Sequence, residues 1–79
     1  MLAETQEFEG KVYNARHGGP FDRGSADSYY NRKRRPHFFS DATYMSMEIE
    51  ERHMTKAQIA EYNAGYDYNE QLGDKKDWG

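Results

Sequence analysis

The residues best suited to chemistry lie in one run, from Tyr29 to Phe39, which reads YYNRKRRPHFF. Four consecutive cations stand between aromatic side chains on either side. Arginine and lysine neutralise phosphates, and aromatic rings stack on unpaired bases. This combination predicts a contact with single-stranded RNA or with a bulge of ribosomal RNA. The residues assigned to that contact are Arg23, Tyr29, Tyr30, Arg32, Lys33, Arg34, Arg35 and His37.

The charge of the whole chain is opposite in sign to that of this run. The net charge is −3, with −2 on residues 1–31, +4 on residues 32–35 and −5 on residues 36–79. Nucleic-acid-binding domains usually carry a net positive charge, so a contact with RNA should be confined to the run. Two other interpretations stay open. The cations would complement the dipole at a helix C-terminus, with the neighbouring aromatics in the core, or they would meet an acidic protein partner.

Carboxylates dominate the C-terminal half of the chain and suggest a second function. Clustered carboxylates imitate a phosphate backbone and occupy basic grooves on proteins that bind nucleic acid. Ordinary solubility accounts for the same cluster. The alternative function is therefore a protein that binds and inhibits another protein through its acidic half. The residues assigned to this partner surface are Met45, Met47, Glu48, Ile49, Glu50 and Trp78.

Other classes of chemistry have no support in the sequence. The chain has no cysteine, which excludes disulfides, thiol catalysis and cysteine-ligated zinc. The histidines, His17, His37 and His53, lack the i, i+4 spacing of a helical metal site. Glycine-rich phosphate loops and nucleophile elbows are also missing from the sequence. We expect a non-enzymatic binding module with no cofactor and no metal.

Length and composition restrict the fold that positions these residues. A chain of 79 residues forms one small domain, spanning residues 1–79, with residues 1–6 and 74–79 expected to be frayed. Only five residues are Leu, Ile or Val, against seven Tyr, four Phe and one Trp. We therefore expect a thin core built from Tyr, Phe and Met side chains.

Two helices are expected, over residues 20–32 and 55–72. Pro20 suits the first position of the earlier helix, and Pro36 is expected to end it. Thr55 and Gln58 form a capping box at the start of the later helix, which Gly73 should stop.

Small residues should let these two helices approach closely. Gly24 and Ala26 lie on the first helix, and Gly65 interrupts the second at a cost of roughly 1 kcal/mol relative to alanine. We expect the first pair to pack against a stripe of larger side chains on the second helix, formed by Ile59, Tyr62 and Tyr66.

Two segments have strand character. Residues 7–15 suggest a short strand with Phe8 and Val12 on one face, although Gly10 interrupts it. Residues 43–50 alternate, with Met45, Met47 and Ile49 on one side. We expect 7–13 to pair with 43–50, or 43–50 to pair with another chain and form a homodimer. The expected fold class is small α+β, or mainly helical.

Two motifs resemble a known family. The first is Arg23-Gly24-Ser25-Ala26, followed by Arg32 and Pro36-His37, and the second is Tyr62-Asn63-Ala64-Gly65-Tyr66. Together they resemble small proteins related to ribosome modulation factor. The run Arg-Gly-Ser-Ala-Asp-Ser-Tyr-Tyr and the terminal Lys-Asp-Trp are also similar to short phage and prophage proteins.

The resemblance implies a particular arrangement and setting. It implies two helices joined by a basic, proline-containing connector, and contact with the ribosome. A phage origin would make the alternative partner a host protein. No apolar run is long enough to span a membrane, and the acidic N-terminus is unlike a signal peptide. We therefore expect a cytoplasmic protein, in the host cytoplasm if it is phage-encoded, with no membrane partner.

Overall fold

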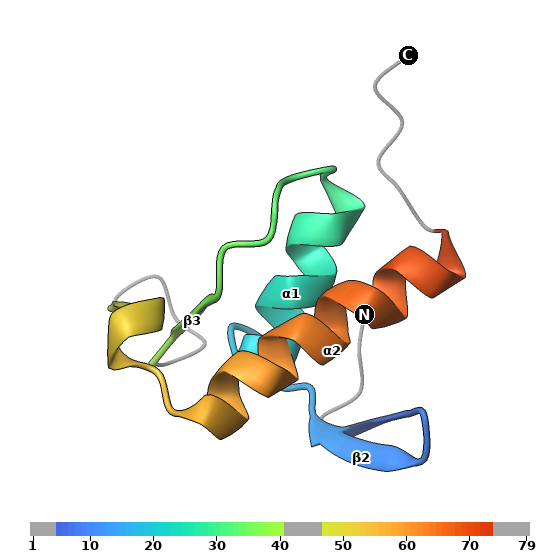
Figure 1. The fold of residues 1–79 in the computed structure, drawn as a ribbon, viewed down its shortest axis with the longest axis horizontal. Helices are drawn as coiled ribbons and strands as arrows, with labels where there is room; N and C mark the ends of the chain where they lie inside the picture. The colour runs from blue at the N-terminus through green and yellow to red at the C-terminus, as the bar shows by residue number, and fades with distance from the viewer. Residues whose placement is uncertain (1–4, 41–46, 74–79) are drawn as a thin grey trace.

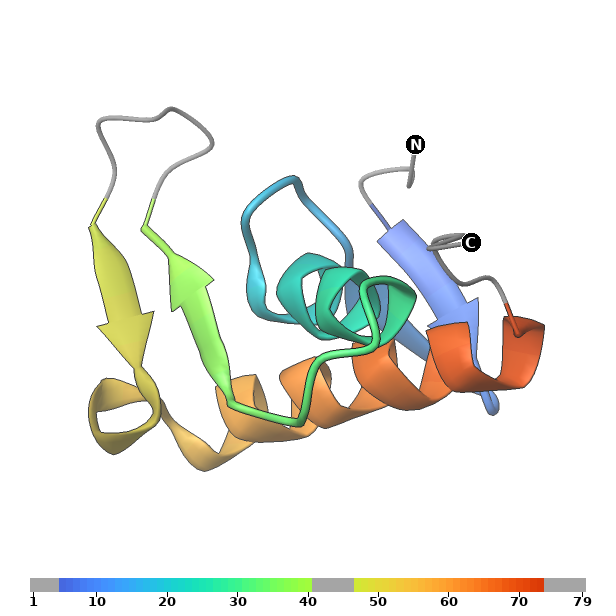
Figure 2. The ribbon, with the colours of Figure 1, turned by 90° about the horizontal axis from the view of Figure 1, so that it is seen from above.

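The computed structural model describes residues 5–40 and 47–73, and this part of the chain has a small α+β fold, as expected. Two helices cross each other, and two antiparallel hairpins lie at opposite ends of the helix pair (Figures 1 and 2). A short connector, residues 30–36, joins α1 to β3. The elements in order are β1 (Thr5–Phe8), β2 (Lys11–Asn14), α1 (Pro20–Tyr29), β3 (His37–Phe39), β4 (Glu48–Glu50), a 3-10 turn (Glu51–His53) and α2 (Lys56–Leu72).

The two helices touch through their backbones. A Cβ at Gly24 would overlap the carbonyl oxygen of Tyr62 and lie 2.9 Å from the Tyr66 nitrogen. On the other helix, a Cβ at Gly65 would overlap the carbonyl oxygen of Phe21. Only glycine allows such an approach at both positions, because the obstacles are backbone atoms that cannot move aside. The predicted close packing is confirmed at Gly24, where Tyr62 and Tyr66 face it, and at Gly65.

An aromatic cluster fills the space between the helices and the first hairpin. Phe21 is fully buried, and its ring lies 5.3 Å from that of Tyr13 and 5.6 Å from that of Tyr68. The ring of Phe8 meets Tyr68 edge-on at 5.8 Å. Aromatic contacts of this kind bury large areas, so the expected core of rings is present.

The segment expected to be one strand is instead a hairpin. β1 pairs with β2 across a two-residue loop, Glu9-Gly10, in which φ is +51° and +80°. Positive φ at both positions is the type I′ geometry that matches the twist of paired strands. The single strand over 7–15 was wrong. Phe8 and Val12 also do not share a face, because Phe8 lies opposite Lys11 and is buried, whereas Val12 lies opposite Glu7 and is 62% exposed. Residues 5 and 6, within the start expected to be frayed, belong to β1, while residues 1–4 and 74–79 lie outside the described ranges.

The first helix ends earlier than residue 32, and Pro36 does not end it. Asn31 has φ of +59°. Its N–H donates to the Ser28 carbonyl at 3.0 Å, and the Arg32 N–H donates to the Asp27 carbonyl at 2.8 Å. These two bonds form a Schellman motif, in which a left-handed residue turns the chain off the helix. Asparagine tolerates that conformation better than most residues.

The described part of the alternating segment pairs with a strand that was not predicted. β4 lies antiparallel to β3, with Phe38 opposite Ile49 and Phe39 opposite Glu48. The expected pairing with residues 7–13 was wrong, because β1 and β2 pair with each other. On its far side, Phe39 bonds to the loop before α1, where its N–H donates to the Gly18 carbonyl at 2.7 Å. Residues 43–46 lie outside the described ranges, and a homodimer through this segment stays a prediction.

The start of α2 is the one the sequence indicates. The Gln58 N–H donates to the Thr55 hydroxyl at 3.1 Å, and the Thr55 N–H donates to the Gln58 side chain at 2.9 Å. Gly73, with φ of +69°, ends the helix as predicted.

The glycine contact gives a first prediction. Gly24→Ala should lower the free energy of unfolding by about 3 kcal/mol or more, because overpacking against backbone cannot relax. Gly10→Ala, at a position with φ of +80° and no atom near a new Cβ, should cost only about 1 kcal/mol. Urea denaturation of both variants measures the difference, and equal losses would contradict the backbone contact.

The capping box gives a second prediction. Thr55→Ala should lower the free energy of unfolding by about 1 kcal/mol, because an N–H in the first turn loses its acceptor. Thr55→Asn keeps a side-chain acceptor and should retain most of the stability. Chemical denaturation of the two variants tests this, and an unchanged Thr55→Ala protein would mean that the cap contributes nothing.

Candidate functional site

The basic run and the two elements beside it enclose a pocket of about 310 Å³. Four cations and two carboxylates leave its lining with a formal charge of +2, counting histidine as uncharged, on a chain whose net charge is −3. The pocket brings together five of the eight residues predicted to contact RNA. The lining residues are Arg23, Asp27, Arg32, Lys33, Arg35, His37, Phe39 and Glu48.

Helix α1 contributes a cation and an acid one turn apart. The Arg23 guanidinium lies over the ring of Phe39, 5.5 Å from its centroid. It forms no ion pair with any described residue, and its buried Nε has no hydrogen-bond acceptor. Asp27 is 3% exposed, and its nearest cation is Arg32 at 3.6 Å. The helix thus supplies one cation that is not neutralised and one carboxylate that is.

A buried tyrosine ties the connector to both helices. The Tyr62 hydroxyl donates to the Asp27 carboxylate and accepts the Arg35 N–H at 3.1 Å. Burial, and after it the hydrogen bond to Asp27, raise the pKa of the Tyr62 phenol above its usual value. The hydroxyl is therefore protonated at neutral pH and able to donate.

Two more bonds hold the connector backbone in place. The Tyr66 hydroxyl donates to the Arg32 carbonyl, and His37 Nδ1 donates to the Arg35 carbonyl at 2.7 Å. The backbone is thus fixed at Arg32 and at Arg35, while both guanidinium groups stay exposed at the pocket. This is a defined placement of charge, unlike a frayed helix end.

An acid on the second hairpin faces the pocket from the other side. Glu48 Oε1 lies 2.8 Å from Arg35 Nη2. This hydrogen bond raises the pKa of Arg35 and lowers that of Glu48, so the pair is intact at neutral pH and weakens only in acid. The side chains of Arg35 and Glu48 are 61% and 36% exposed, respectively. A carboxylate thus holds one of the guanidinium groups that an incoming anion would use.

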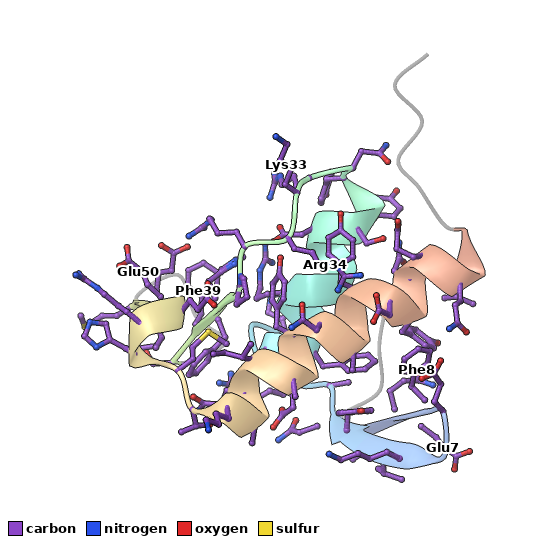
Figure 3. The ribbon with its side chains drawn as sticks, in the orientation of Figure 1. Glu7, Phe8, Lys33, Arg34, Phe39 and Glu50 are labelled. Atoms are coloured by element: carbon purple, nitrogen blue, oxygen red, sulfur yellow. The ribbon has the colours of Figure 1, made fainter. Side chains whose placement is uncertain are left out.

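One member of the basic run lies outside the pocket. Arg34 turns back onto α2, where it pairs with Asp67 and donates to Asn63 Oδ1 at 3.2 Å (Figure 3). Its guanidinium also lies 4.3 Å from the centroid of the Tyr66 ring. These contacts fasten the connector to α2. Lys33, at the outer edge of the connector, forms no hydrogen bond or ion pair with a described residue.

The two tyrosines predicted to stack on bases lie beside the pocket and do not line it. The rings of Tyr29 and Tyr30 meet edge-on with centroids 5.0 Å apart. The Arg32 guanidinium lies over the Tyr30 ring at 5.0 Å. Tyr30 therefore contacts Arg32, a lining residue of the pocket, without lining the pocket itself.

The six residues predicted to bind a protein partner do not form one described surface. Met47 is 73% exposed, and Ile49 is half-buried opposite Phe38. Glu50 pairs with Arg52 at 3.2 Å, whereas Glu48 belongs to the pocket. The other two predicted residues, Met45 and Trp78, lie outside the described ranges.

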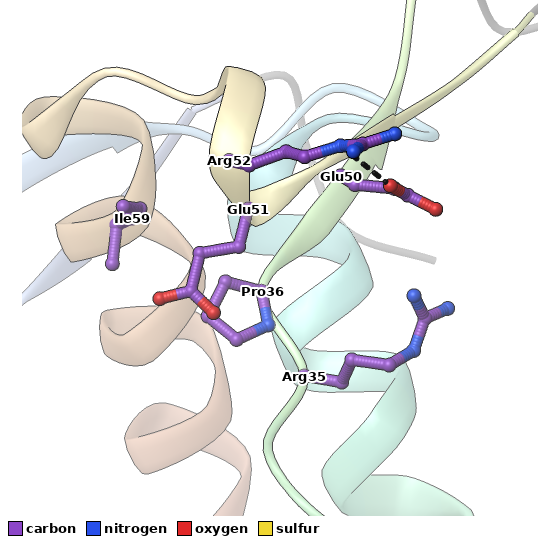
Figure 4. Close-up of a pocket in the computed structure, with 6 residues that line it drawn as sticks. All are labelled: Arg35, Pro36, Glu50, Glu51, Arg52 and Ile59. Atoms are coloured by element: carbon purple, nitrogen blue, oxygen red, sulfur yellow. Dashed lines mark ion pairs between the residues drawn. The ribbon is translucent and has the colours of Figure 1, made fainter.

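A second pocket, of about 600 Å³, lies between the connector, the 3-10 turn and the first part of α2 (Figure 4). Its two cations are matched by two acids, and an ion pair joins Arg52 to Glu50. This balance gives the pocket no preference for the charge of a ligand. Its lining residues are Arg35, Pro36, Glu50, Glu51, Arg52 and Ile59.

The described residues hold neither a metal-binding cluster nor a membrane-spanning helix. Within residues 5–40 and 47–73, no three histidine or acidic side chains are placed to hold a metal ion. No helix in these ranges is both long and apolar enough to cross a membrane. No family model, curated protein or solved structure matches the chain.

Three residues that line the pocket, Asp27, Phe39 and Glu48, were not among those predicted to contact RNA. Asp27 lies four residues after Arg23, so a shared helix face was the available signal. Phe39 belongs to the basic-aromatic run, but only its pairing in β3 places it against Arg23. Glu48 was assigned to a protein partner, and nothing local in the sequence links it to Arg35.

The buried hydroxyl gives a third prediction. Tyr62→Phe should lower the free energy of unfolding by about 1–3 kcal/mol, because the buried Asp27 carboxylate and the Arg35 N–H each lose a partner. Tyr66→Phe, which removes a bond to one exposed carbonyl, should cost about 1 kcal/mol or less. Denaturation curves measure both losses, and amide exchange at Arg35 should accelerate only in Tyr62→Phe. Equal losses would contradict the role given to Tyr62.

Proposed function

We propose that this protein is a non-enzymatic binding module that contacts RNA or the ribosome through the basic pocket. The observation that carries the proposal is the local concentration of positive charge. In a chain of net charge −3, five residues of the predicted RNA contact line one pocket with a formal charge of +2. Phosphates are the abundant cellular anions that such a site attracts.

The existing ion pairs are compatible with binding a phosphate. Arg35 pairs with Glu48 through side chains that are 61% and 36% exposed, respectively. Exposed ion pairs contribute about 0–1 kcal/mol, so a phosphate can replace Glu48 at little cost. The Arg32 side chain is 59% exposed and can meet a phosphate while it stays beside the buried Asp27, 3.6 Å away. Arg23 and Lys33 form no ion pair with described residues, so no such exchange is needed there.

The resemblance to the ribosome modulation factor family supports the same proposal. The motif residues Arg32, Pro36 and His37 lie in or beside the connector between the two helices. Gly24 and Gly65, also from the motifs, form the contact between those helices. On this proposal the protein acts in the cytoplasm, or in the host cytoplasm if it is phage-encoded.

Inhibition of a host protein through the acidic half has less support. Several carboxylates needed for a phosphate-like array already have partners in the protein itself. Glu48 pairs with Arg35, Asp67 with Arg34, and Glu50 with Arg52. Glu70 accepts a hydrogen bond from the Ser28 hydroxyl at 2.6 Å. These acids already have partners within the described residues, which leaves fewer of them for a phosphate-like array, so we favour the RNA proposal.

Salt dependence of binding to single-stranded RNA tests the proposal. Lys33→Gln should weaken binding and lower the slope of log affinity against log salt by about 0.7, the value for one lost contact with a single strand. Lys33 is exposed and unpaired within the described residues, so the fold should be unaffected. Fluorescence anisotropy of a labelled oligonucleotide at several salt concentrations gives both quantities.

One variant serves as the control for this experiment. Lys56→Gln, an equal charge change at the start of α2, should leave the slope unchanged. Absence of RNA binding at low salt, or equal effects of Lys33→Gln and Lys56→Gln, would overturn the proposal.

A further inference from the structure

We infer that the basic pocket recognises the terminal phosphate of an RNA strand, a phosphate monoester, in preference to the phosphodiesters within the strand. This inference rests on the proposed RNA contact and specifies the part of the RNA that the pocket takes. It depends on the charge, donor arrangement and size of the pocket.

The charge of the lining matches a monoester. A phosphate monoester carries about −1.5 to −2 at pH 7, whereas each phosphodiester carries a single negative charge. Arg32 and Arg35 are offset by Asp27 and Glu48. The +2 that remains corresponds to Arg23 and Lys33, and a dianion would balance it fully.

The donors approach from different parts of the fold. Arg23 comes from α1, and the other cations come from the connector, whose backbone is fixed at Arg32 and Arg35. A terminal phosphate has three oxygens free to accept hydrogen bonds, whereas a diester has two. Guanidinium groups are suited to paired bonds with such oxygens. Converging donors therefore favour the ligand with more free oxygens.

The size of the pocket suits a strand end. Its volume of about 310 Å³ is at the lower limit of the range for sites that bind small molecules. Such a volume accommodates a phosphate with its attached sugar. The ring of Phe39 supports the Arg23 guanidinium at 5.5 Å, which places this cation in the wall of the pocket.

Glu48 increases the selectivity of the pocket. Its carboxylate holds Arg35 until a ligand displaces it, so the incoming anion has to compete with a fixed negative charge. A dianion competes better than a monoanion for the same guanidinium, so Glu48 weakens the binding of a phosphodiester more than that of a phosphate monoester. The acid on β4 thereby discriminates against internal phosphates.

Binding of matched oligonucleotides tests the inference. Three ten-nucleotide RNAs of one sequence carry a label at the 3′ end and a hydroxyl, a phosphate or a methyl phosphate at the 5′ end. The methyl group converts the monoester into a diester without removing the phosphorus. A second pair, labelled at the 5′ end, carries a hydroxyl or a phosphate at the 3′ end and distinguishes the two ends as the source of the monoester.

We expect the RNA with a terminal phosphate, at one end or both, to bind at least tenfold more tightly than its hydroxyl and methyl phosphate counterparts. Equal affinity across all the RNAs would overturn the inference and leave the RNA proposal in place. Failure of every RNA to bind would overturn both. A phosphoserine peptide with no other charged side chain serves as a further comparison. If it binds as tightly as the phosphorylated RNA, the assignment to RNA is overturned.

Variants locate the preference in the pocket. Glu48→Gln should tighten binding of the phosphorylated RNA about threefold or more, because Arg35 is released. Glu7→Gln makes the same charge change on the distant β1–β2 hairpin (Figure 3) and should have no such effect. Lys33→Gln should reduce the preference for the phosphate end. Equal responses to Glu48→Gln and Glu7→Gln, or a preference unchanged by Lys33→Gln, would overturn the inference.

Discussion

The fold depends on the contact between two helix backbones at Gly24 and Gly65. At both positions a side chain would overlap a carbonyl oxygen of the facing helix, so the approach is available only to glycine. The contact compensates for the scarcity of aliphatic residues, because it brings α1 and α2 together without a thick layer of side chains. It also brings Tyr62, one turn before Gly65 on α2, within reach of Asp27 on α1.

The arrangement of the basic run depends on the contact between the two helices. With so few aliphatic residues, the tyrosines supply both buried surface and hydrogen bonds, and the hydroxyls of Tyr62 and Tyr66 fix the connector at Arg35 and Arg32. A run of four cations would repel itself on a mobile segment. Held on this backbone, it separates into Arg34, which fastens the connector to α2, and three cations that join Arg23 around a pocket. The result is a small positive site on an acidic protein.

The sequence by itself determined the features that arise from neighbours along the chain. Pro20 begins α1, the reciprocal bonds of Thr55 and Gln58 begin α2, and Gly73 ends it. The composition predicted an aromatic core, and the glycines in the helices predicted their close approach. Most pocket residues were also recognisable, because cations and aromatic residues are adjacent in sequence. The helix boundaries depend on residues within about one turn of each other, whereas the aromatic core follows from composition alone.

Only the tertiary structure decided the pairing of the strands and the direction of each cation. A Glu-Gly loop is a weak hairpin signal, because type I′ turns usually carry Asn or Asp before glycine. β3 is three residues long, too short to show alternation. Whether Arg34 or Arg35 faces the pocket depends on acids far away in the chain, Asp67 and Glu48. Arg34 and Arg35 are chemically identical neighbours in the sequence. After folding, the contact with Asp67 gives Arg34 a structural role, whereas the contact with Glu48 keeps Arg35 at the pocket.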